Sequence, residues 1–364
     1  MGKRIFSTIV LWSVVFSALW FFRTNGAIAL TNAGNALNTA TLATSGTDDA
    51  ALYDSLSLTI AGANIGGDLS LSGAGSIGQT GAILAATLNV ATTGGAIVLT
   101  NAGNSFGPAT ISTSGTDNAS LYDLSDLTVA SANVGGTLTL SSGGAIGQTG
   151  AIHAAALNAA TTAGAIMLTN SGNNFGTVTL STSGTDDASV FDATNLVVAS
   201  ANIGGDLTLS VDGSLGQTGA IHAASLNATT TGGAINLTNA GNSFAIATLA
   251  TAGTDNASLY DAVDLTIAGA TVGGTLTLSG GGAIGQSGAI HAASLVATTT
   301  HGALTLTNAG NTVATATLST SGADNASFTD ASNLIIASAN VGGTLTLSGG
   351  GSIDQTGAIH AAGL

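Results

Sequence analysis

Residues 95–104 read GAIVLTNAGN, and close relatives of this stretch recur along the chain at a fixed interval. They start at Gly26, Gly95, Gly164, Gly233 and Gly302, so that successive start positions differ by 69 (95 − 26). A second marker keeps the interval, since SGTDDAALYD at 45–54 becomes SGTDNASLYD at 114–123. No insertion breaks the register, so the chain is a tandem array of one unit. The repeats span 26–94, 95–163, 164–232, 233–301 and 302–364, the last being incomplete.

Short runs of alternating apolar and polar residues fill each repeat. In the first repeat these runs span 27–30, 40–43, 52–60, 68–71 and 83–90. Alternation with period two predicts strands with one buried face, and the Gly, Asn, Asp and Ser clusters between them predict tight corners. Because 69 is three times 23, we expect each repeat to form three coils of about 23 residues. The predicted fold is all-β, a right-handed parallel β-helix (solenoid) of about 15 coils.

Stacked coils are expected to bring equivalent residues of successive repeats into ladders. Two apolar positions are candidates for the core. One holds Leu37, Phe106, Phe175, Phe244 and Val313, and the other holds Leu52, Leu121, Val190, Leu259 and Phe328. A third position is always asparagine, whose amide we expect to satisfy backbone groups at a corner. Its members are Asn35, Asn104, Asn173, Asn242 and Asn311.

Composition supports this fold class and removes several functions. Of 364 residues, 53 are Gly, one is Pro, none is Cys and only 6% are charged. Many weak helix formers argue against a helical bundle, and the apolar share of 45% argues against disorder. The missing cysteines exclude a disulfide scaffold and a thiolate metal site. The only basic residues are Lys3, Arg4 and Arg23, so the array cannot neutralise phosphates and nucleic-acid binding is excluded.

Residues 1–29 differ in character from the array. Lys3 and Arg4 precede an apolar stretch over residues 5–22, and Ala27-Ile28-Ala29 offers a small-residue cleavage site. These features predict a secretory signal peptide, although a stretch of 18 residues (22 − 4) also suits an uncleaved signal anchor. In both cases residues 30–364 form the solenoid outside the cytoplasm, and only the N-terminal segment contacts a membrane.

The repeat phrases carry a family resemblance. GAIxLTNAGNxF, TDxASLYDxxxLTxAxAxVGGTLTL and GAIGQTGAI resemble the repeats of filamentous-haemagglutinin-like and autotransporter-type bacterial surface proteins, over essentially all of residues 26–364. The resemblance implies a secreted or surface-attached solenoid, linked to adhesion, aggregation or contact with neighbouring cells. It implies no activity, and the Asn-Pro motifs of a separate secretion domain and a C-terminal membrane barrel are not seen.

Histidines and aspartates recur at fixed repeat positions. His153, His222, His291 and His360 share one position, where the first repeat has Leu84, and His301 is isolated. One repeat of three coils would place neighbouring histidines about 14 Å apart, too far to share a zinc ion. Aspartates lie six apart in every repeat, and calcium favours oxygen-rich corners. The candidate calcium residues are Asp48, Asp54, Asp117, Asp123, Asp186, Asp192, Asp255, Asp261, Asp324 and Asp330. Asx-turn capping is the preferred interpretation, because the glycine-rich nonapeptide of calcium-binding β-rolls is absent, and no cofactor is expected.

Two further functions fit the pattern less well. A polysaccharide-acting β-helix enzyme needs an asymmetric pair of carboxylates, whereas here only a few aspartates, such as Asp212 and Asp354, fall outside the lattice. Ice binding needs a dense array, whereas motifs such as Thr137-Leu-Thr139 recur only once per repeat.

We therefore expect a non-enzymatic, adhesin-like contact surface that is secreted or displayed on a bacterial cell. Expected partners are glycans or proteins of a host or neighbouring cell, and end-to-end self-association of the solenoid is an additional expectation. The alternative is a fragment of a larger exported protein whose active part lies elsewhere.

Overall fold

The computed structural model describes residues 19–364, which form 35 strands connected by short corners. The first eighteen strands are β1 Leu19–Arg23, β2 Ile28–Leu30, β3 Thr39–Ala43, β4 Ala50–Asp54, β5 Leu58–Asn64, β6 Asp68–Gly73, β7 Ile77–Gln79, β8 Ile83–Ala85, β9 Thr87–Thr92, β10 Ile97–Leu99, β11 Ser105–Phe106, β12 Ala109–Ser112, β13 Ala119–Asp123, β14 Leu127–Ser142, β15 Ile146–Gln148, β16 Ile152–Thr161, β17 Ile166–Leu168 and β18 Asn174–Ser181. The others are β19 Ala188–Asp192, β20 Leu196–Asn202, β21 Asp206–Val211, β22 Leu215–Gln217, β23 Ile221–Thr230, β24 Ile235–Leu237, β25 Ser243–Ala250, β26 Ala257–Asp261, β27 Leu265–Gly280, β28 Ile284–Gln286, β29 Ile290–Thr299, β30 Leu304–Leu306, β31 Thr312–Ser319, β32 Ala326–Asp330, β33 Leu334–Gly349, β34 Ile353–Gln355 and β35 Ile359–Gly363.

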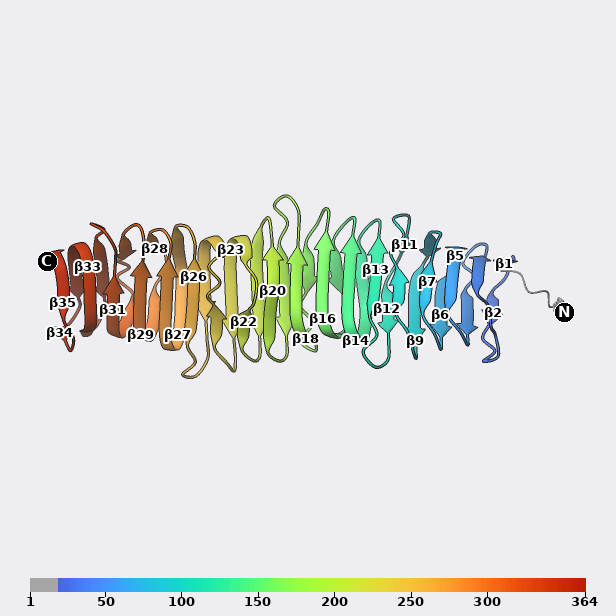
Figure 1. Cartoon of the computed structure of the whole chain (residues 1–364), viewed down its shortest axis with the longest axis horizontal. Helices are drawn as coiled ribbons and strands as arrows, with labels where there is room; N and C mark the ends of the chain where they lie inside the picture. Colours follow the sequence, from blue (N-terminus) through green and yellow to red (C-terminus); the bar gives the residue numbers. More distant parts are fainter. Residues whose placement is uncertain (1–18) are drawn as a thin grey trace.

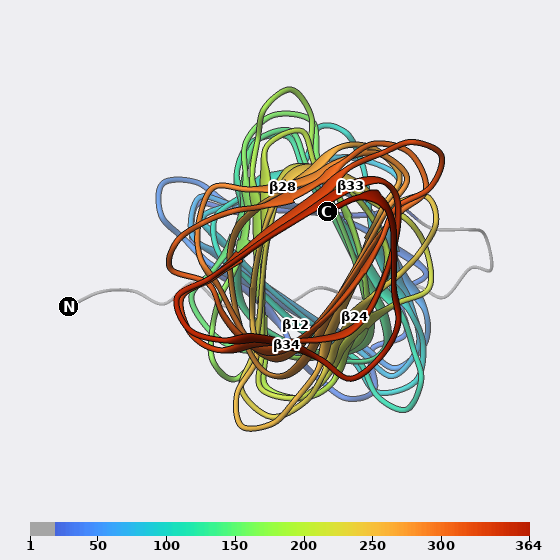
Figure 2. The same cartoon turned by 90° about the vertical axis from the view of Figure 1, so that its left-hand side faces the viewer.

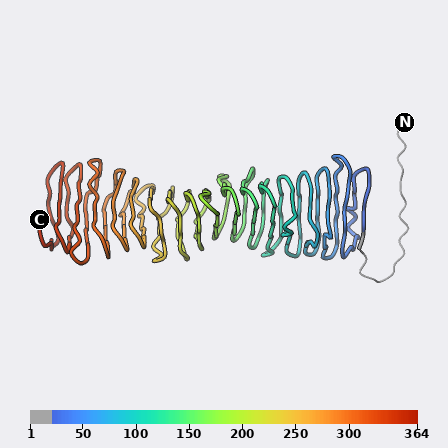
Figure 3. Tube along the Cα trace, turned by 90° about the horizontal axis from the view of Figure 1, so that it is seen from above, coloured from blue at the N-terminus to red at the C-terminus, as the bar shows by residue number. Residues whose placement is uncertain are grey.

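All strand pairs are parallel and join one turn of the chain to the next. Figure 1 shows the strands side by side along a rod that runs from β1 to β35, and Figure 2 looks along its axis. The prediction of a parallel β-solenoid is therefore confirmed, with about 17 turns. The continuous winding is visible in the trace of Figure 3.

Each turn contributes to two stacks of strands on opposite sides of the rod. Stack A begins with β1, β3 and β5, whereas stack B begins with β2, β4, β6, β9 and β12. The long strands bend from one stack to the other. Residues 129–133 of β14 pair with β12 in stack B, and residues 138–142 of the same strand pair with β13 in stack A.

The turn is shorter than predicted, and the repeat does not contain a whole number of turns. A register path in stack A runs from Thr39 to Thr179 in seven turns, through Thr59, Gly78, Val98, Ser120, Thr139 and Asn158. The residue number rises by 140 over these seven turns (179 − 39), or about 20 residues per turn. Seven turns therefore contain nearly the same number of residues as two repeats. Each repeat thus makes about 3.5 turns, so the prediction of three 23-residue coils is wrong. An odd number of half-turns moves every repeat position to the opposite stack in the next repeat.

The core lies between the two stacks and is filled by alternate residues of each strand. In β4, for example, Ala50, Leu52 and Asp54 are buried. The two predicted apolar positions do face inward, and Phe175 is fully buried. They do not form ladders with their equivalents, because the half-turn puts these on opposite sides. At the first position large and small residues are stacked together, since Phe175 pairs with Ala154 and Phe106 with Ala85. At the second position large residues are stacked on each other, as Leu52 is on Leu71.

Two expected boundaries change in the structure. The run predicted over residues 52–60 is two strands, β4 and β5, separated by a corner at 55–57, and the run predicted over 83–90 is also two strands, β8 and β9. The three-residue strand β7 was not predicted. Residues 1–18 of the expected signal segment lie outside the described residues. Residues 19–23 form β1, which pairs with β3 and adds a first strand to stack A. No helix that could span a membrane occurs in residues 19–364.

Candidate functional site

One aspartate of each predicted calcium pair is a buried structural group. Asp123 is fully buried, and its two carboxylate oxygens accept the backbone N–H groups of Phe106 at 2.9 Å and Ser125 at 2.8 Å. The equivalent residues Asp54, Asp192, Asp261 and Asp330 make the same pair of contacts. Burial raises the pKa of the Asp261 carboxyl above its ordinary value, against the opposing effect of these hydrogen bonds.

The other aspartate of the pair sits at the far end of the same strand. Asp117 precedes β13 and accepts the backbone N–H of Gly95 at 2.7 Å, whereas Asp123 ends β13. Residues six apart along an extended strand are separated by about 20 Å, so the two carboxylates cannot chelate one ion. Asp186 and Asp324 repeat the contact of Asp117. In residues 19–364 no group of three His, Cys, Asp or Glu side chains is placed to hold a metal ion.

The invariant asparagine satisfies a corner, as predicted, but through a different arrangement. Asn104 is fully buried, its oxygen accepts the N–H of Ile83 and its amide donates to the carbonyl of Leu99. It also exchanges two hydrogen bonds, of 2.8 and 3.0 Å, with the side chain of Gln79. The partner one turn away is therefore a glutamine and not another asparagine. The same Gln–Asn pair recurs as Gln148–Asn173, Gln217–Asn242 and Gln286–Asn311.

The four repeated histidines belong to exposed rows that sequence analysis did not reveal. In stack B, register pairs connect seven outward-facing positions, one per turn. From the N-terminal side they are Tyr53, Ser72, Ala91, Ser112, Asn133, His153 and Asn174. At about 4.8 Å per turn the row is about 29 Å long. It runs along the rod axis and contains no Asp, Glu, Lys or Arg.

The row recurs in later repeats with closely similar chemistry. The second row, in stack A, is Tyr122, Ser141, Ala160, Ser181, Asn202, His222 and Ser243. The third, again in stack B, is Phe191, Ser210, Thr229, Ala250, Thr271, His291 and Thr312. The fourth, in stack A, is Tyr260, Ser279, Thr298, Ser319, Asn340 and His360. Successive rows therefore face opposite sides of the rod.

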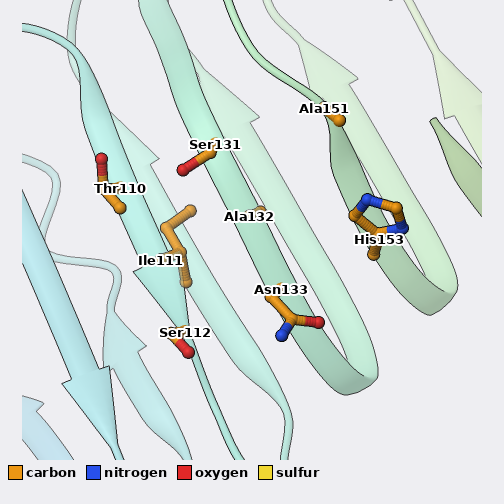
Figure 4. Close-up of a pocket in the computed structure, with 8 residues that line it drawn as sticks. All are labelled: Thr110, Ile111, Ser112, Ser131, Ala132, Asn133, Ala151 and His153. Atoms are coloured by element: carbon orange, nitrogen blue, oxygen red, sulfur yellow. The ribbon is translucent and has the colours of Figure 1, made fainter. Parts of the chain in front are cut away.

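A shallow groove lies at the histidine end of the first row. It has a volume of about 550 Å³ and is lined by Thr110, Ile111, Ser112, Ser131, Ala132, Asn133, Ala151 and His153. Figure 4 shows Ser112, Asn133 and His153 side by side on three neighbouring strands. Asn133 and His153 are exposed, and in the third row the equivalent His291 lies 2.6 Å from the Thr312 hydroxyl.

A β-bulge in every repeat shapes this groove. The register shifts between Ala109 and Thr110, because Ala109 pairs with Val129 and Thr110 with Ser131, which leaves Ala130 unpaired. The Ala130 carbonyl then faces Gly150 of the next turn, where a Cβ would lie only 2.2 Å from its oxygen. Bulges redirect side chains and are frequent beside functional sites. The extra residue is an alanine in each repeat: Ala61, Ala130, Ala199, Ala268 and Ala337.

Comparison with known families gives one match. A family model described as repeats of unknown function (DUF5649) matches residues 47–113, 116–182, 185–251, 254–320 and 323–364. The start positions of successive matches differ by 69 (116 − 47), in agreement with the period of the sequence. No curated protein and no solved structure matches the chain. None of these findings connects the repeats to filamentous-haemagglutinin-like or autotransporter-type proteins.

Proposed function

The chain belongs to the family of repeats of unknown function (DUF5649), and we propose that it is a non-catalytic contact scaffold, secreted or displayed on a bacterial cell surface. The observation that carries this proposal is the half-turn repeat. It presents the same uncharged row on opposite sides of one rod, so a single chain offers the same contact surface in two directions.

The regularity of the rod also supports a role without catalysis. The buried carboxylates each accept two backbone N–H groups, and the exposed rows hold no carboxylate. Acid–base chemistry needs an asymmetric set of groups with shifted pKa values, whereas this lattice repeats one environment. The rod carries its contact residues on strands rather than on mobile loops, which suits a rigid spacer.

Adhesion to cells tests the proposed function directly. Beads coated with the full chain are mixed with bacterial cells, and beads coated with an unrelated acidic protein serve as the control. The expected result is clustering of cells on the test beads alone. Equal, background clustering on both kinds of bead would refute the contact function.

Surface display is tested separately by protease treatment of intact cells that express the chain with a C-terminal tag. Loss of the tag without lysis is expected. A tag that stays protected until lysis would refute surface display by this chain on its own.

A further inference from the structure

We propose that the exposed rows bind a linear, uncharged polysaccharide that lies along the rod axis. This inference rests on the proposed contact function and names the chemical class of its partner. It starts from the groove of Ser112, Asn133 and His153 and from the row of outward-facing residues that continues from Ser112 to Tyr53.

Charge selects against ionic partners. The rows contain no Lys or Arg that could pair with sulfate, phosphate or uronate groups, and no carboxylate that could pair with a cationic polymer. The whole chain has a formal charge of −15, and its basic residues all lie within the first 23 positions. An anionic polymer would therefore be repelled along the entire rod, and an uncharged polymer is the partner that fits.

Backbone geometry selects against an extended peptide. A peptide that binds by strand addition needs the unpaired N–H and C=O groups of a sheet edge. Along the rows these groups are already paired between successive turns, for example where β14 pairs with β12 and β16. Recognition at the rows is therefore left to outward side chains.

Those side chains match the chemistry of a sugar chain. The Ser112 hydroxyl, the Asn133 amide and the His153 ring offer hydrogen-bond donors and acceptors to hydroxyl groups, at about 4.8 Å intervals along the axis. The side chains of Ser72 and Ala91 are small, so they leave room for a polymer over the middle of the row. At its other end the half-buried ring of Tyr53 provides an apolar surface with a hydroxyl, which suits the mixed faces of a pyranose. A row of about 29 Å fits an extended polymer better than a compact ligand.

Successive rows lie on opposite sides of the rod, so one chain can bind on both sides. His153 and His291 lie in stack B, whereas His222 and His360 lie in stack A. One rod can then hold two polysaccharide chains, one on each side, and join them without any second protein.

The binding test uses the full chain with cellohexaose and chitohexaose as uncharged probes and polygalacturonate as the anionic probe, all by isothermal titration calorimetry. The expected result is binding of at least one uncharged probe and none of polygalacturonate. Combining His153→Leu, His222→Leu, His291→Leu and His360→Leu is expected to weaken that binding at least tenfold. Leucine is tolerated at this position, because Leu84 occupies it in the first repeat, so the variant should keep the melting temperature of the parent. His301→Leu, which changes an exposed histidine outside the rows, is the matched control and should bind as the parent does.

A one-sided variant tests the two-sided arrangement. His153→Leu with His291→Leu removes the histidines of stack B alone, and this variant should still bind the oligosaccharide but should no longer raise the viscosity of a hydroxyethyl cellulose solution. No binding of either uncharged probe, binding of polygalacturonate alone, or unchanged binding by the fourfold variant would overturn the proposal. Clustering of cells on coated beads together with no oligosaccharide binding would show that the contact function stands and the ligand class is wrong.

Discussion

Deletion of one repeat tests the half-turn geometry directly. Removal of residues 164–232 joins Ala163 to Gly233, which is the repeat equivalent of Gly164, so the shortened chain should fold as a continuous rod. In the parent, His153 and His291 lie in the same stack and are separated by seven turns, or about 34 Å along the axis. The deletion removes about 3.5 of these turns. It leaves about 17 Å along the axis and moves the second position to the opposite stack.

Spin labels at these two positions, introduced as His153→Cys and His291→Cys, report the change by pulsed electron–electron double resonance. The parent should give a distance of about 34 Å, set by seven turns of strand spacing. The two stacks are about 10 Å apart, so the backbone separation after deletion is about 20 Å, and the outward labels lengthen it further. Three whole turns per repeat would instead place both labels on one side about 14 Å apart. That shorter same-side distance, in a deletion variant that melts cooperatively, would refute the half-turn.

Three further substitutions test the core, a buried carboxylate and a corner. Phe175→Asp puts a charge at a fully buried site and should lower the free energy of unfolding by more than about 3 kcal/mol in urea melts, whereas Met167→Asp, at a 58% exposed site, should change it little. Burial raises the pKa of the Asp261 carboxyl in the folded state, so the protonated carboxyl stabilises the fold below the ordinary pKa, and this stabilisation is lost as the pH rises through the folded pKa. In thermal melts, the stability advantage of the parent over Asp261→Asn should therefore shrink between about pH 3 and about pH 7. An advantage that grows with pH would contradict this. Gly135→Ala would place a Cβ 1.7 Å from the Gly115 carbonyl oxygen and should cost about 1–3 kcal/mol by urea melts, whereas Gly147→Ala, with nothing within 4 Å, should be nearly neutral.

The solenoid itself was predictable from the sequence, because the evidence for it is local. Alternation of apolar and polar residues identified most of the strands, and the Asp123 and Asn104 positions were correctly assigned to capping roles. The length of a turn was not predictable in the same way. It depends on how many residues each corner consumes and on the extra alanine at each bulge, such as Ala130, and neither changes the alternation pattern visibly. The repeat length of 69 therefore suggests three equal coils, although the structure has about 3.5 turns per repeat.

The missed rows follow from that single error. Tyr53 and His153 fall in different repeats, and their numbers differ by 100 (153 − 53). The register pairs place them five turns apart in one row, which a turn of the observed length allows and a longer coil does not. With 23-residue coils the histidines appear as isolated surface residues. The uncharged surface of the row could therefore not be predicted, because the sequence does not show which residues lie one turn apart.

The half-turn also constrains what the repeat can contain. Each position must fit stack A in one repeat and stack B in the next, so the two sides of the rod are built from the same residues and the same corners. A large inward residue cannot stack on its own equivalent, and it meets a different and often smaller one, as Phe175 meets Ala154. Alternate large and small residues fill a core without voids or overpacking. Two closely similar outer surfaces then arise from one repeat sequence, one on each side of the rod.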